Sequence, residues 1–129
     1  MNHFILIDDD EMINFIHQQV IFSVDPSSSI TMFGSAEEGF NKLNDLGFTN
    51  RNGNFIVFVD INMPEINGFE LLTRLESASW NYDHIHLFVV SSSLFEKDRE
   101  QALSFPFVKG YKEKPLNKND ILNILEAFR

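Results

Sequence analysis

Short apolar runs alternate with amphipathic stretches along the whole chain, and no linker-like segment separates them. The apolar runs are typical of parallel strands covered on both faces, because such strands show no polar alternation. The amphipathic stretches are typical of helices that bury one side. We therefore predict strands over residues 3–7, 30–33, 55–59, 86–90 and 107–112. We predict helices over residues 10–24, 35–46, 67–77 and 93–103, and a last helix that starts at residue 117.

Several predicted helix ends carry residues that can satisfy the free backbone groups there. Capping boxes are expected at residues 35–38 and 93–96, where a serine stands three residues before a glutamate. Asn67 and Asn117 are expected to start the third and the last helix. Gly47 is expected to end the second helix.

The apolar residues of each helix predict the side that faces the sheet. For helix 10–24 we expect a stripe made of Met12, Ile13, Phe15, Ile16, Val20 and Phe22. For the last helix we expect the inward residues to be Ile121, Leu122, Ile124, Leu125 and Phe128. Most of the 14 phenylalanines should be interior. Loops are expected over residues 25–29, 50–54 and 80–83.

The alternation of strands and helices predicts an α/β fold with a parallel sheet and right-handed crossovers. Five strand–helix units are too few for an eight-fold barrel, so we predict a doubly wound five-stranded parallel sheet. The strand over 30–33 is short and polar, which places it nearest a sheet edge. With 129 residues, the chain is expected to form a single domain over residues 1–129.

The composition argues against several classes of function. With 19 acidic and 10 basic side chains, the net charge is −9, whereas direct binding of nucleic acid depends on lysine and arginine. The chain has no cysteine, and therefore neither disulfides nor thiol chemistry. Its first apolar run is too short for a signal peptide or a membrane span, so we expect a cytoplasmic protein. Most of the negative charge is expected to serve solubility.

Polar residues stand where four of the predicted strands stop. Asp8, Asp60 and Ser91 directly follow strands, and Lys114 lies two residues after its strand. In an open α/β sheet, ligands bind in the crevice beyond the carboxyl ends of the strands. Two carboxylates, a hydroxyl and an ammonium group at that edge predict a site that handles phosphate or a metal ion.

Asp8, Asp9 and Asp10 follow the first strand in succession. Adjacent carboxylates repel each other, and a bound cation relieves that repulsion. The alternative interpretation is helix capping, which needs one aspartate, and Asp10 is expected to fill that role. Asp60 reaches the same crevice from the central strand, although taken alone it is equally typical of the turn before Pro64. Oxygen ligands of this kind suit Mg²⁺, and a carboxylate can also act as the nucleophile that forms an aspartyl phosphate.

Lys114 and Ser91 complete the expected site. A lysine just after a strand is usually solvated, but within this crevice its ammonium group can pair with a phosphoryl oxygen or with Asp60. Pro115 constrains how the chain leaves the strand, through either a trans or a cis bond. Ser91 offers a hydroxyl group, whereas Ser93 is better suited to cap the next helix.

These residues stand in motifs that resemble the response-regulator receiver domain of two-component signalling, as a stand-alone receiver of the chemotaxis type. The motifs are Ile5-Leu-Ile-Asp-Asp-Asp10, Val59-Asp-Ile-Asn-Met-Pro64 with Asn67-Gly68, Val90-Ser-Ser92 and Lys114-Pro115. They occur in order at compatible spacing, and the resemblance covers the whole chain. It implies a flavodoxin-like sheet with the strand order 2-1-3-4-5.

The resemblance also implies the chemistry of the site. Asp60 matches the phosphoacceptor, and Lys114 matches the lysine that binds the phosphoryl group. Asp8, Asp9 and Asp60 match the carboxylates around Mg²⁺, and the backbone carbonyl of Asn62 matches the group that joins them. The chain would then be a phosphorylation-dependent signalling switch and not an enzyme, beyond its own phosphorylation and dephosphorylation.

The implied switch and partners follow from the same family. Ser91 matches the switch hydroxyl and Tyr111 the aromatic that moves with it, although an aromatic residue late in a strand is as often a core residue. A sensor histidine kinase or a histidine phosphotransfer protein would supply the phosphoryl group in a phosphorelay. A downstream protein effector would bind the face of the fourth helix, fifth strand and fifth helix. Because a helix fills the tail, we expect that effector to be a separate protein.

Two alternatives from the residues themselves stay open. One is a magnesium-dependent phosphohydrolase, because some use Asp-x-Asp after the first strand, and Asp8 and Asp10 have that spacing. Against it, Met12 stands where a hydroxyl is expected, and a second acidic pair after the lysine is missing. The other is an unphosphorylated adaptor with the receiver fold.

Overall fold

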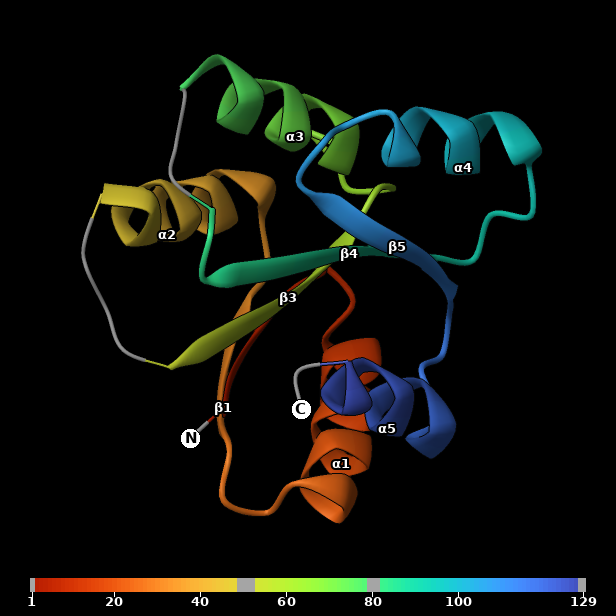
Figure 1. Cartoon of the computed structure of the whole chain (residues 1–129). Coiled ribbons are helices and arrows are strands. Elements are labelled where there is room, and N and C mark those ends of the chain that lie inside the picture. Colours follow the sequence, from red (N-terminus) through yellow and green to blue (C-terminus); the bar gives the residue numbers. More distant parts are fainter. Residues whose placement is uncertain (1, 49–52, 79–81, 128–129) are drawn as a thin grey trace.

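Five parallel strands form one sheet, ordered β2-β1-β3-β4-β5, between two layers of helices (Figure 1). The structure is a computed structural model that describes residues 2–48, 53–78 and 82–127. The strands are β1 (Asn2–Ile7), β2 (Ser29–Phe33), β3 (Asn54–Asp60), β4 (Ile85–Ser91) and β5 (Val108–Glu113). Each predicted strand end lies within one residue of the observed end. The predicted strand order and the edge position of β2 are confirmed.

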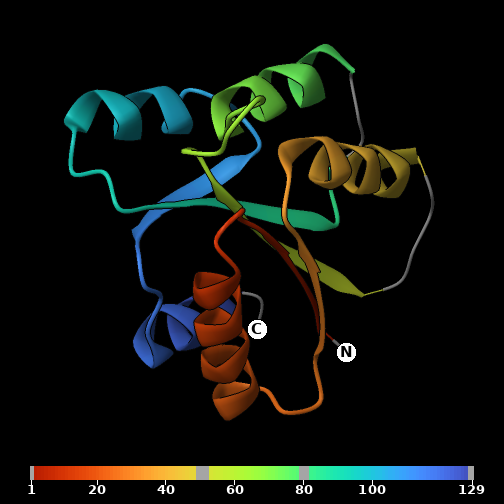
Figure 2. The ribbon, with the colours of Figure 1, turned by 180° about the vertical axis from the view of Figure 1, so that it is seen from behind.

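The helices cover both faces of the sheet, as the two opposite views show (Figure 1, Figure 2). One face carries α1 and α5, and the other carries α2, α3 and α4. The helices are α1 (Glu11–Val24), α2 (Ala36–Phe48), α3 (Gly68–Ser77), α4 (Glu96–Leu103) and α5 (Lys118–Glu126). The doubly wound arrangement is therefore confirmed.

The core consists of two apolar clusters, one on each face of the sheet. Successive side chains of a strand point to opposite faces, so Val57 and Val59 of β3 pack under α2 and α3. Ile56 and Phe58 of the same strand pack under α1 and α5. The central strand is thus buried on both sides, which is why its sequence is continuously apolar.

The register of the strands brings their carboxyl ends to one edge of the sheet. The last residue pairs between neighbouring strands are Ile7 with Val59, Asp60 with Val90, and Ser91 with Glu113. Beyond the final pair, the backbone N–H of Lys114 still donates a hydrogen bond to the carbonyl of Ser91 at 2.9 Å. The polar residues that follow the strands therefore share one edge.

Four helix starts agree with the sequence-based expectation. In each, a side-chain oxygen of the capping residue accepts a hydrogen bond from a backbone N–H two or three residues later, at 2.9–3.3 Å. The capping residues are Asp10, Ser35, Asn67 and Asn117. At Asn117 the reciprocal bond from its own N–H to Asp120 completes a capping box.

The predicted capping box of the fourth helix is wrong. α4 begins at Glu96, with Phe95 as its N-cap and no side-chain cap. Ser93 is instead held by other contacts: its N–H donates to Ser91 Oγ at 3.0 Å, and its hydroxyl donates to Asp98 at 2.5 Å. Ser93 therefore lies in the segment between β4 and α4, and the helix starts three residues after it.

The predicted end of the second helix at Gly47 is also wrong, because α2 continues through this residue to Phe48. A glycine is tolerated within a helix at a cost of about 1 kcal/mol. Of the loops predicted over 50–54 and 80–83, residues 50–52 and 80–81 lie outside the described residues. Residues 82–83 belong to neither a helix nor a strand, as predicted, whereas Asn54 already belongs to β3.

The buried side of α1 differs from the predicted apolar stripe. Three members of the stripe are exposed, namely Met12, Phe15 and Phe22. The residues that α1 buries are Asn14, His17 and Ile21. Apolar residues occur around most of the first half of this helix, so their spacing alone does not select one face. Docking on the sheet selects it.

The inward side of α5 agrees with prediction at Ile121, Ile124 and Leu125, whereas Leu122 is exposed and its assignment was wrong. Phe128 lies outside the described residues. Most phenylalanines with described side chains are buried or half-buried, as expected. Within the described ranges, every helix is too short or too polar to traverse a lipid bilayer.

Candidate functional site

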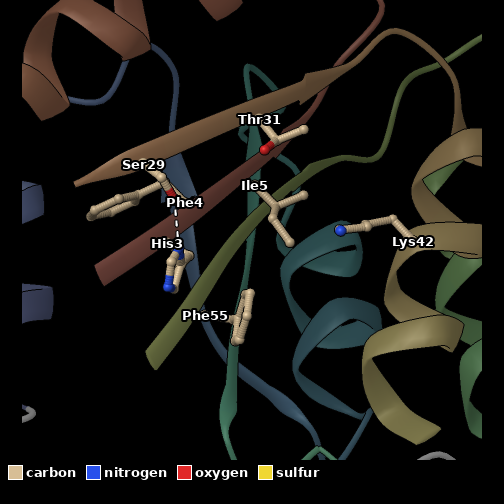
Figure 3. Close-up of a pocket in the computed structure, with 7 residues that line it drawn as sticks. All are labelled: His3, Phe4, Ile5, Ser29, Thr31, Lys42 and Phe55. Atoms are coloured by element: carbon tan, nitrogen blue, oxygen red, sulfur yellow. Dashed lines mark hydrogen bonds between the residues drawn. The ribbon is translucent and has the colours of Figure 1, made fainter. Parts of the chain in front are cut away.

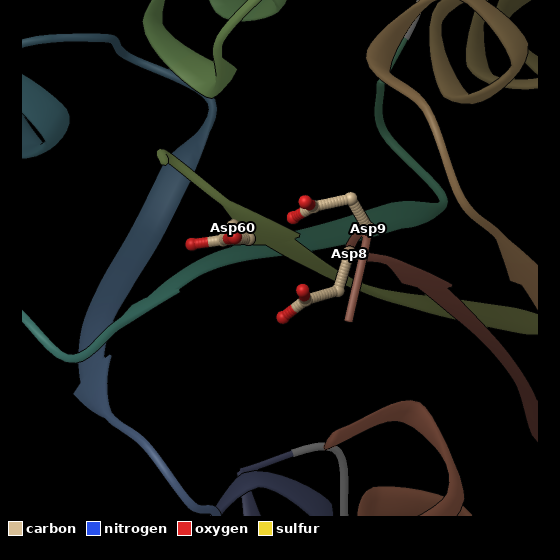
Figure 4. A group of neighbouring side chains, drawn as sticks. All are labelled: Asp8, Asp9 and Asp60. Carbon is tan, nitrogen blue, oxygen red and sulfur yellow. The ribbon is translucent and has the colours of Figure 1, made fainter. Parts of the chain in front are cut away.

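Three aspartates meet at the carboxyl edge of the sheet. Asp8 and Asp9 follow β1 and Asp60 ends β3, and one carboxylate oxygen from each lies within 4.8 Å of the others. Figure 4 shows the three side chains directed to the same side of the sheet edge. Asp8 and Asp60 are 5% and 4% exposed, whereas Asp9 is exposed. The structure thus brings together the acids that the sequence assigned to one crevice.

Lys114 lies directly beside two of these acids. Its Nζ is 2.6 Å from Asp8 Oδ2 and 3.2 Å from Asp60 Oδ1, and its side chain is largely buried. Burial alone would lower the pKa of Lys114, but the hydrogen bond to Asp8 and the charges of Asp60 and Asp8 raise it above its usual value. The ammonium group is therefore charged. The Lys114–Pro115 peptide bond that follows is cis.

Asp60 is the acid with the most strongly perturbed environment. Burial raises the pKa of Asp60, and the charge of Asp8 adds to this, so that the pKa reaches about 6. The backbone N–H of Asn62, at 3.2 Å from Asp60 Oδ1, and the charge of Lys114 oppose the rise. A single lysine therefore does not neutralise the site, and the remaining negative charge favours a further cation.

The backbone behind Asp60 is held by the first residue of α3. The N–H of Gly68 donates to the carbonyl of Ile61 at 3.1 Å. A Cβ at position 68 would lie 2.4 Å from the carbonyl oxygen of Asp60 and 2.7 Å from the Cα of Ile61. Only a glycine allows this approach, so Gly68 fixes the position of the Asp60 backbone.

Ser91 and Tyr111 contact the same loop residue. Ser91 is fully buried, and its hydroxyl accepts a hydrogen bond from the N–H of Ser93 at 3.0 Å. Tyr111 is half-buried, and its hydroxyl donates to the carbonyl of Ser93 at 3.0 Å. The tyrosine ring also packs on the core, so Tyr111 has both a core contact and a polar one.

Two buried polar residues of α1 were missed by the sequence analysis. Asn14 Nδ2 donates to the backbone carbonyl of Asp8 at 2.9 Å, and His17 Nε2 accepts from the N–H of Leu116 at 3.0 Å. Burial lowers the pKa of His17, against the charge of Asp8, which fits a neutral ring with an acceptor nitrogen. Asn14, His17 and Ile21 have the i, i+3, i+7 spacing of one helix face, which could have indicated that the two polar residues are buried. The apolar residues between them obscured this pattern.

Asp10 takes no part in the acidic cluster. Its Oδ1 accepts hydrogen bonds from the N–H groups of Met12 and Ile13, as a helix cap does. The Asp-x-Asp interpretation needs the side chain of Asp10 free for proton transfer, whereas this oxygen serves the helix. The geometry therefore disfavours a phosphohydrolase that uses Asp8 and Asp10.

The cluster is suited to a hard divalent cation. All three side-chain donors are carboxylate oxygens, which are the ligands that Mg²⁺ and Ca²⁺ prefer. The cluster combines two buried carboxylates with an exposed one, which leaves it accessible to solvent ligands. Burial and the charge of Asp8 raise the pKa of Asp60 despite the nearby Lys114, so a further cation would stabilise the ionised carboxylate. These residues fit Mg²⁺.

A second group of polar side chains lies near the amino end of the sheet (Figure 3). His3 Nδ1 and Ser29 Oγ are 2.6 Å apart, and the His3 ring stacks on Phe55 with 4.9 Å between centroids. Lys42 of α2 and Thr31 line the same pocket, which has no carboxylate among its lining residues. This pocket therefore lacks the carboxylate ligands that meet at the carboxyl edge.

A family model described as the response regulator receiver domain matches residues 4–126 of the chain. Among curated proteins, none matches. A two-component response regulator from Cytophaga hutchinsonii is 31% identical, with 98% of this chain and 96% of that chain covered and a TM-score of 0.86.

Two more distant structures share the fold. A response regulator receiver protein from Dyadobacter fermentans is 24% identical, with 99% and 98% of the two chains covered and a TM-score of 0.82. A response regulator from Thermotoga maritima, solved in complex with Mg²⁺ and BeF, is 16% identical, with 100% of both chains covered and a TM-score of 0.74.

Proposed function

This chain belongs to the response regulator receiver domain family, and we propose that it is a phosphorylation-dependent signalling switch with Asp60 as its phosphoacceptor. Receiver domains are signalling domains that act with histidine kinases and downstream effectors. As the phosphodonor we propose a sensor histidine kinase or a histidine phosphotransfer protein. Residues 1–129 would form one such domain.

One observation carries the proposal: Asp60 is buried between two other acids and a charged lysine at the edge of the sheet. A buried carboxylate whose pKa is raised to about 6 destabilises the fold, and such groups occur preferentially at functional sites. An adaptor that is never phosphorylated would have no need for this arrangement. The geometry is what a phosphoryl-accepting carboxylate requires.

Mg²⁺ fits the proposed chemistry. Asp8, Asp9 and Asp60 would hold it, with the backbone carbonyl of Asn62, and when bound it would offset the charge between the carboxylate and the incoming phosphoryl group. The Mg²⁺ and BeF complex of the Thermotoga maritima response regulator supports this assignment.

In the proposed reaction, a carboxylate oxygen of Asp60 attacks the phosphorus atom of a phosphohistidine. The P–N bond breaks, and the leaving imidazole nitrogen keeps the electron pair and takes up a proton. The attacking carboxylate must be ionised. Lys114, whose Nζ is 3.2 Å from Asp60 Oδ1, is close enough to pair with a phosphoryl oxygen and so hold the product.

We propose that the signal leaves the site through Ser91 and Tyr111. A phosphoryl oxygen on Asp60 would recruit the Ser91 hydroxyl, which now accepts from the N–H of Ser93. The bond from Tyr111 to the carbonyl of Ser93 would then change as well. Leu94 and Phe95, which are 81% and 77% exposed, follow in the same loop. The face of α4, β5 and α5 beside them is the proposed effector surface.

Intact-mass measurement after incubation with acetyl phosphate and Mg²⁺ tests the function. We expect one added phosphoryl group on the wild-type protein and none on Asp60→Asn. Asp10→Asn is the matched control and should still be labelled, because asparagine caps a helix as well as aspartate does. Label that persists on Asp60→Asn would identify another acceptor, and repeated turnover of substrate would indicate a phosphohydrolase.

A further inference from the structure

The buried face of α1 carries two polar side chains toward the carboxyl edge of the sheet. Asn14 and His17 are 6% and 3% exposed, so both are removed from water. Each uses its polar group on the backbone of a different loop: Asn14 on Asp8 at 2.9 Å, and His17 on Leu116 at 3.0 Å. One helix therefore reaches two loops whose residues are about a hundred positions apart in the sequence.

Packing alone does not explain this choice of residues. Burial of an amide or imidazole costs free energy unless its polar atoms find partners, and Oδ1 of Asn14 has no partner among the described residues. An apolar side chain at either position would fill space without that cost. We therefore attribute the presence of these polar groups to their hydrogen bonds with the backbone of the two loops.

The contact of His17 bears on Lys114. Leu116 lies two residues after Lys114, between the end of β5 and the N-cap Asn117. On the other side, the N–H of Lys114 donates to the carbonyl of Ser91 at 2.9 Å. The segment that carries Lys114 is thus fixed before and after the lysine, and this aims Nζ between Asp8 and Asp60.

The contact of Asn14 bears on the acids. It holds the carbonyl of Asp8, and the N–H of Asp10 donates to Asp8 Oδ1 at 2.9 Å, so the backbone of this turn and the carboxylate of Asp8 are both oriented. Among the described residues, no hydrogen bond or ion pair joins Lys114 to Asn14. The two α1 side chains therefore hold the backbone of different parts of the site, which meet where Lys114 pairs with Asp8.

We propose that Asn14 and His17 are positioning residues with divided roles: Asn14 positions the acids that bind the cation, and His17 positions the lysine that binds the phosphoryl group. This inference depends on the proposed function of the site. It predicts that the two substitutions separate cation binding from anion binding, which a general loss of packing would not do.

Calorimetric titration of the full chain tests this, first with Mg²⁺ alone and then with beryllofluoride in saturating Mg²⁺. We expect His17→Phe, which keeps a ring but no acceptor, to raise the beryllofluoride dissociation constant about fivefold without weakening Mg²⁺ binding. We expect Asn14→Leu to raise the Mg²⁺ dissociation constant by a similar factor, about fivefold.

Two further variants serve as controls. His17→Gln offers an oxygen acceptor to Leu116 and should recover most of the beryllofluoride affinity. Ile21→Ala removes an apolar residue from the same buried face of α1, and it should lower the unfolding midpoint but change neither dissociation constant. Titrations are made at a temperature where each variant is folded by circular dichroism.

Equal weakening of both ligands by both variants, or no change in either, would overturn the division of roles. Failure of His17→Gln to recover affinity would overturn the acceptor role of His17. If the wild-type chain binds neither Mg²⁺ nor beryllofluoride, the proposed function and this inference are both refuted. If the wild-type chain binds both and the variants bind them equally well, this inference alone is refuted.

Discussion

The inner faces of α1 and α3 differ, although the two helices pack on opposite faces of the same sheet. α3 buries Leu71, Leu72 and Leu75, each fully, in the larger apolar cluster. The buried residues of α1 are Asn14, His17 and Ile21, so two of the three are polar. Each buried leucine contributes about 1.5–3 kcal/mol to stability, whereas the buried polar groups offset little more than their own desolvation. The buried face of α3 therefore mainly stabilises the fold, whereas part of the buried face of α1 contacts residues of the site.

The two helices also reach the site in different ways. α1 does so with polar side chains on loop backbone, at Asp8 and Leu116. α3 does so with the absence of a side chain, because Gly68 packs directly on the carbonyl of Asp60. A site can thus be positioned either by hydrogen bonds to loop backbone or by close backbone approach, and the two modes should respond differently to mutation.

The largest expected effect is on the apolar face of α3. Leu72→Ala should lower the free energy of unfolding by about 3 kcal/mol, because it leaves a cavity under a fully buried side chain. The affinity of the folded variant for Mg²⁺ should not change, since this leucine contacts the core and not the site. Urea denaturation and Mg²⁺ titration measure the two quantities. Weaker Mg²⁺ binding in the folded variant would contradict the conclusion that the apolar face of α3 stabilises the fold without contributing to the site.

The next effect concerns the first residue of α3. Gly68→Ala should cost about 2 kcal/mol of stability through overpacking, and it should slow labelling by acetyl phosphate, because the new Cβ displaces the Asp60 backbone. Gly34→Ala is the matched control, since a Cβ there has no neighbour within 4 Å. Labelling of Gly68→Ala at the wild-type rate would show that the close approach does not position Asp60.

The smallest expected effect is the dependence of Mg²⁺ affinity on pH. Because burial and Asp8 raise the pKa of Asp60 to about 6, the metal-free folded protein carries a proton on Asp60 below that pH. A cation must displace this proton, so Mg²⁺ affinity should rise about tenfold between pH 5 and pH 7 and then level off. Calorimetry in buffers of different ionisation enthalpy should detect proton release near pH 6.

Asp60→Asn serves as the control for this titration, since it should remove the pH dependence near 6 together with most of the affinity. An Mg²⁺ affinity in the wild type that stays constant from pH 5 to pH 7 would contradict a raised pKa at this carboxylate.

Much of the fold was predictable because it depends on local pattern. The sequence located every strand to within one residue. The central strands β1, β3 and β4 were recognisable because strands covered on both faces are continuously apolar, and β2 was recognisable as a short, more polar edge strand. The caps Asp10, Asn67 and Asn117 were predictable because a cap bonds to N–H groups two or three residues away. The candidate site was predictable for the same reason: each of its polar residues directly follows, or lies near the end of, a recognisable strand.

The errors occur where a distant element decides. Ser93 has the sequence of a helix cap, but its backbone N–H bonds to Ser91 and its carbonyl accepts from the distant Tyr111, and α4 starts only at Glu96. The exposed Phe15 of α1 is as apolar as a core residue, and the way the helix docks on the sheet turned it outward.

The alternation of strands and helices, the acids and lysine at the strand ends, and the family to which they point could all be inferred from the order of the residues. The contacts of Asn14 and His17 with the loops of the site, and of Gly68 with Asp60, became evident only in the folded chain. Strand formation and helix capping depend on neighbours a few residues away. A hydrogen bond from α1 to Leu116 joins residues that become neighbours only when the sheet is complete.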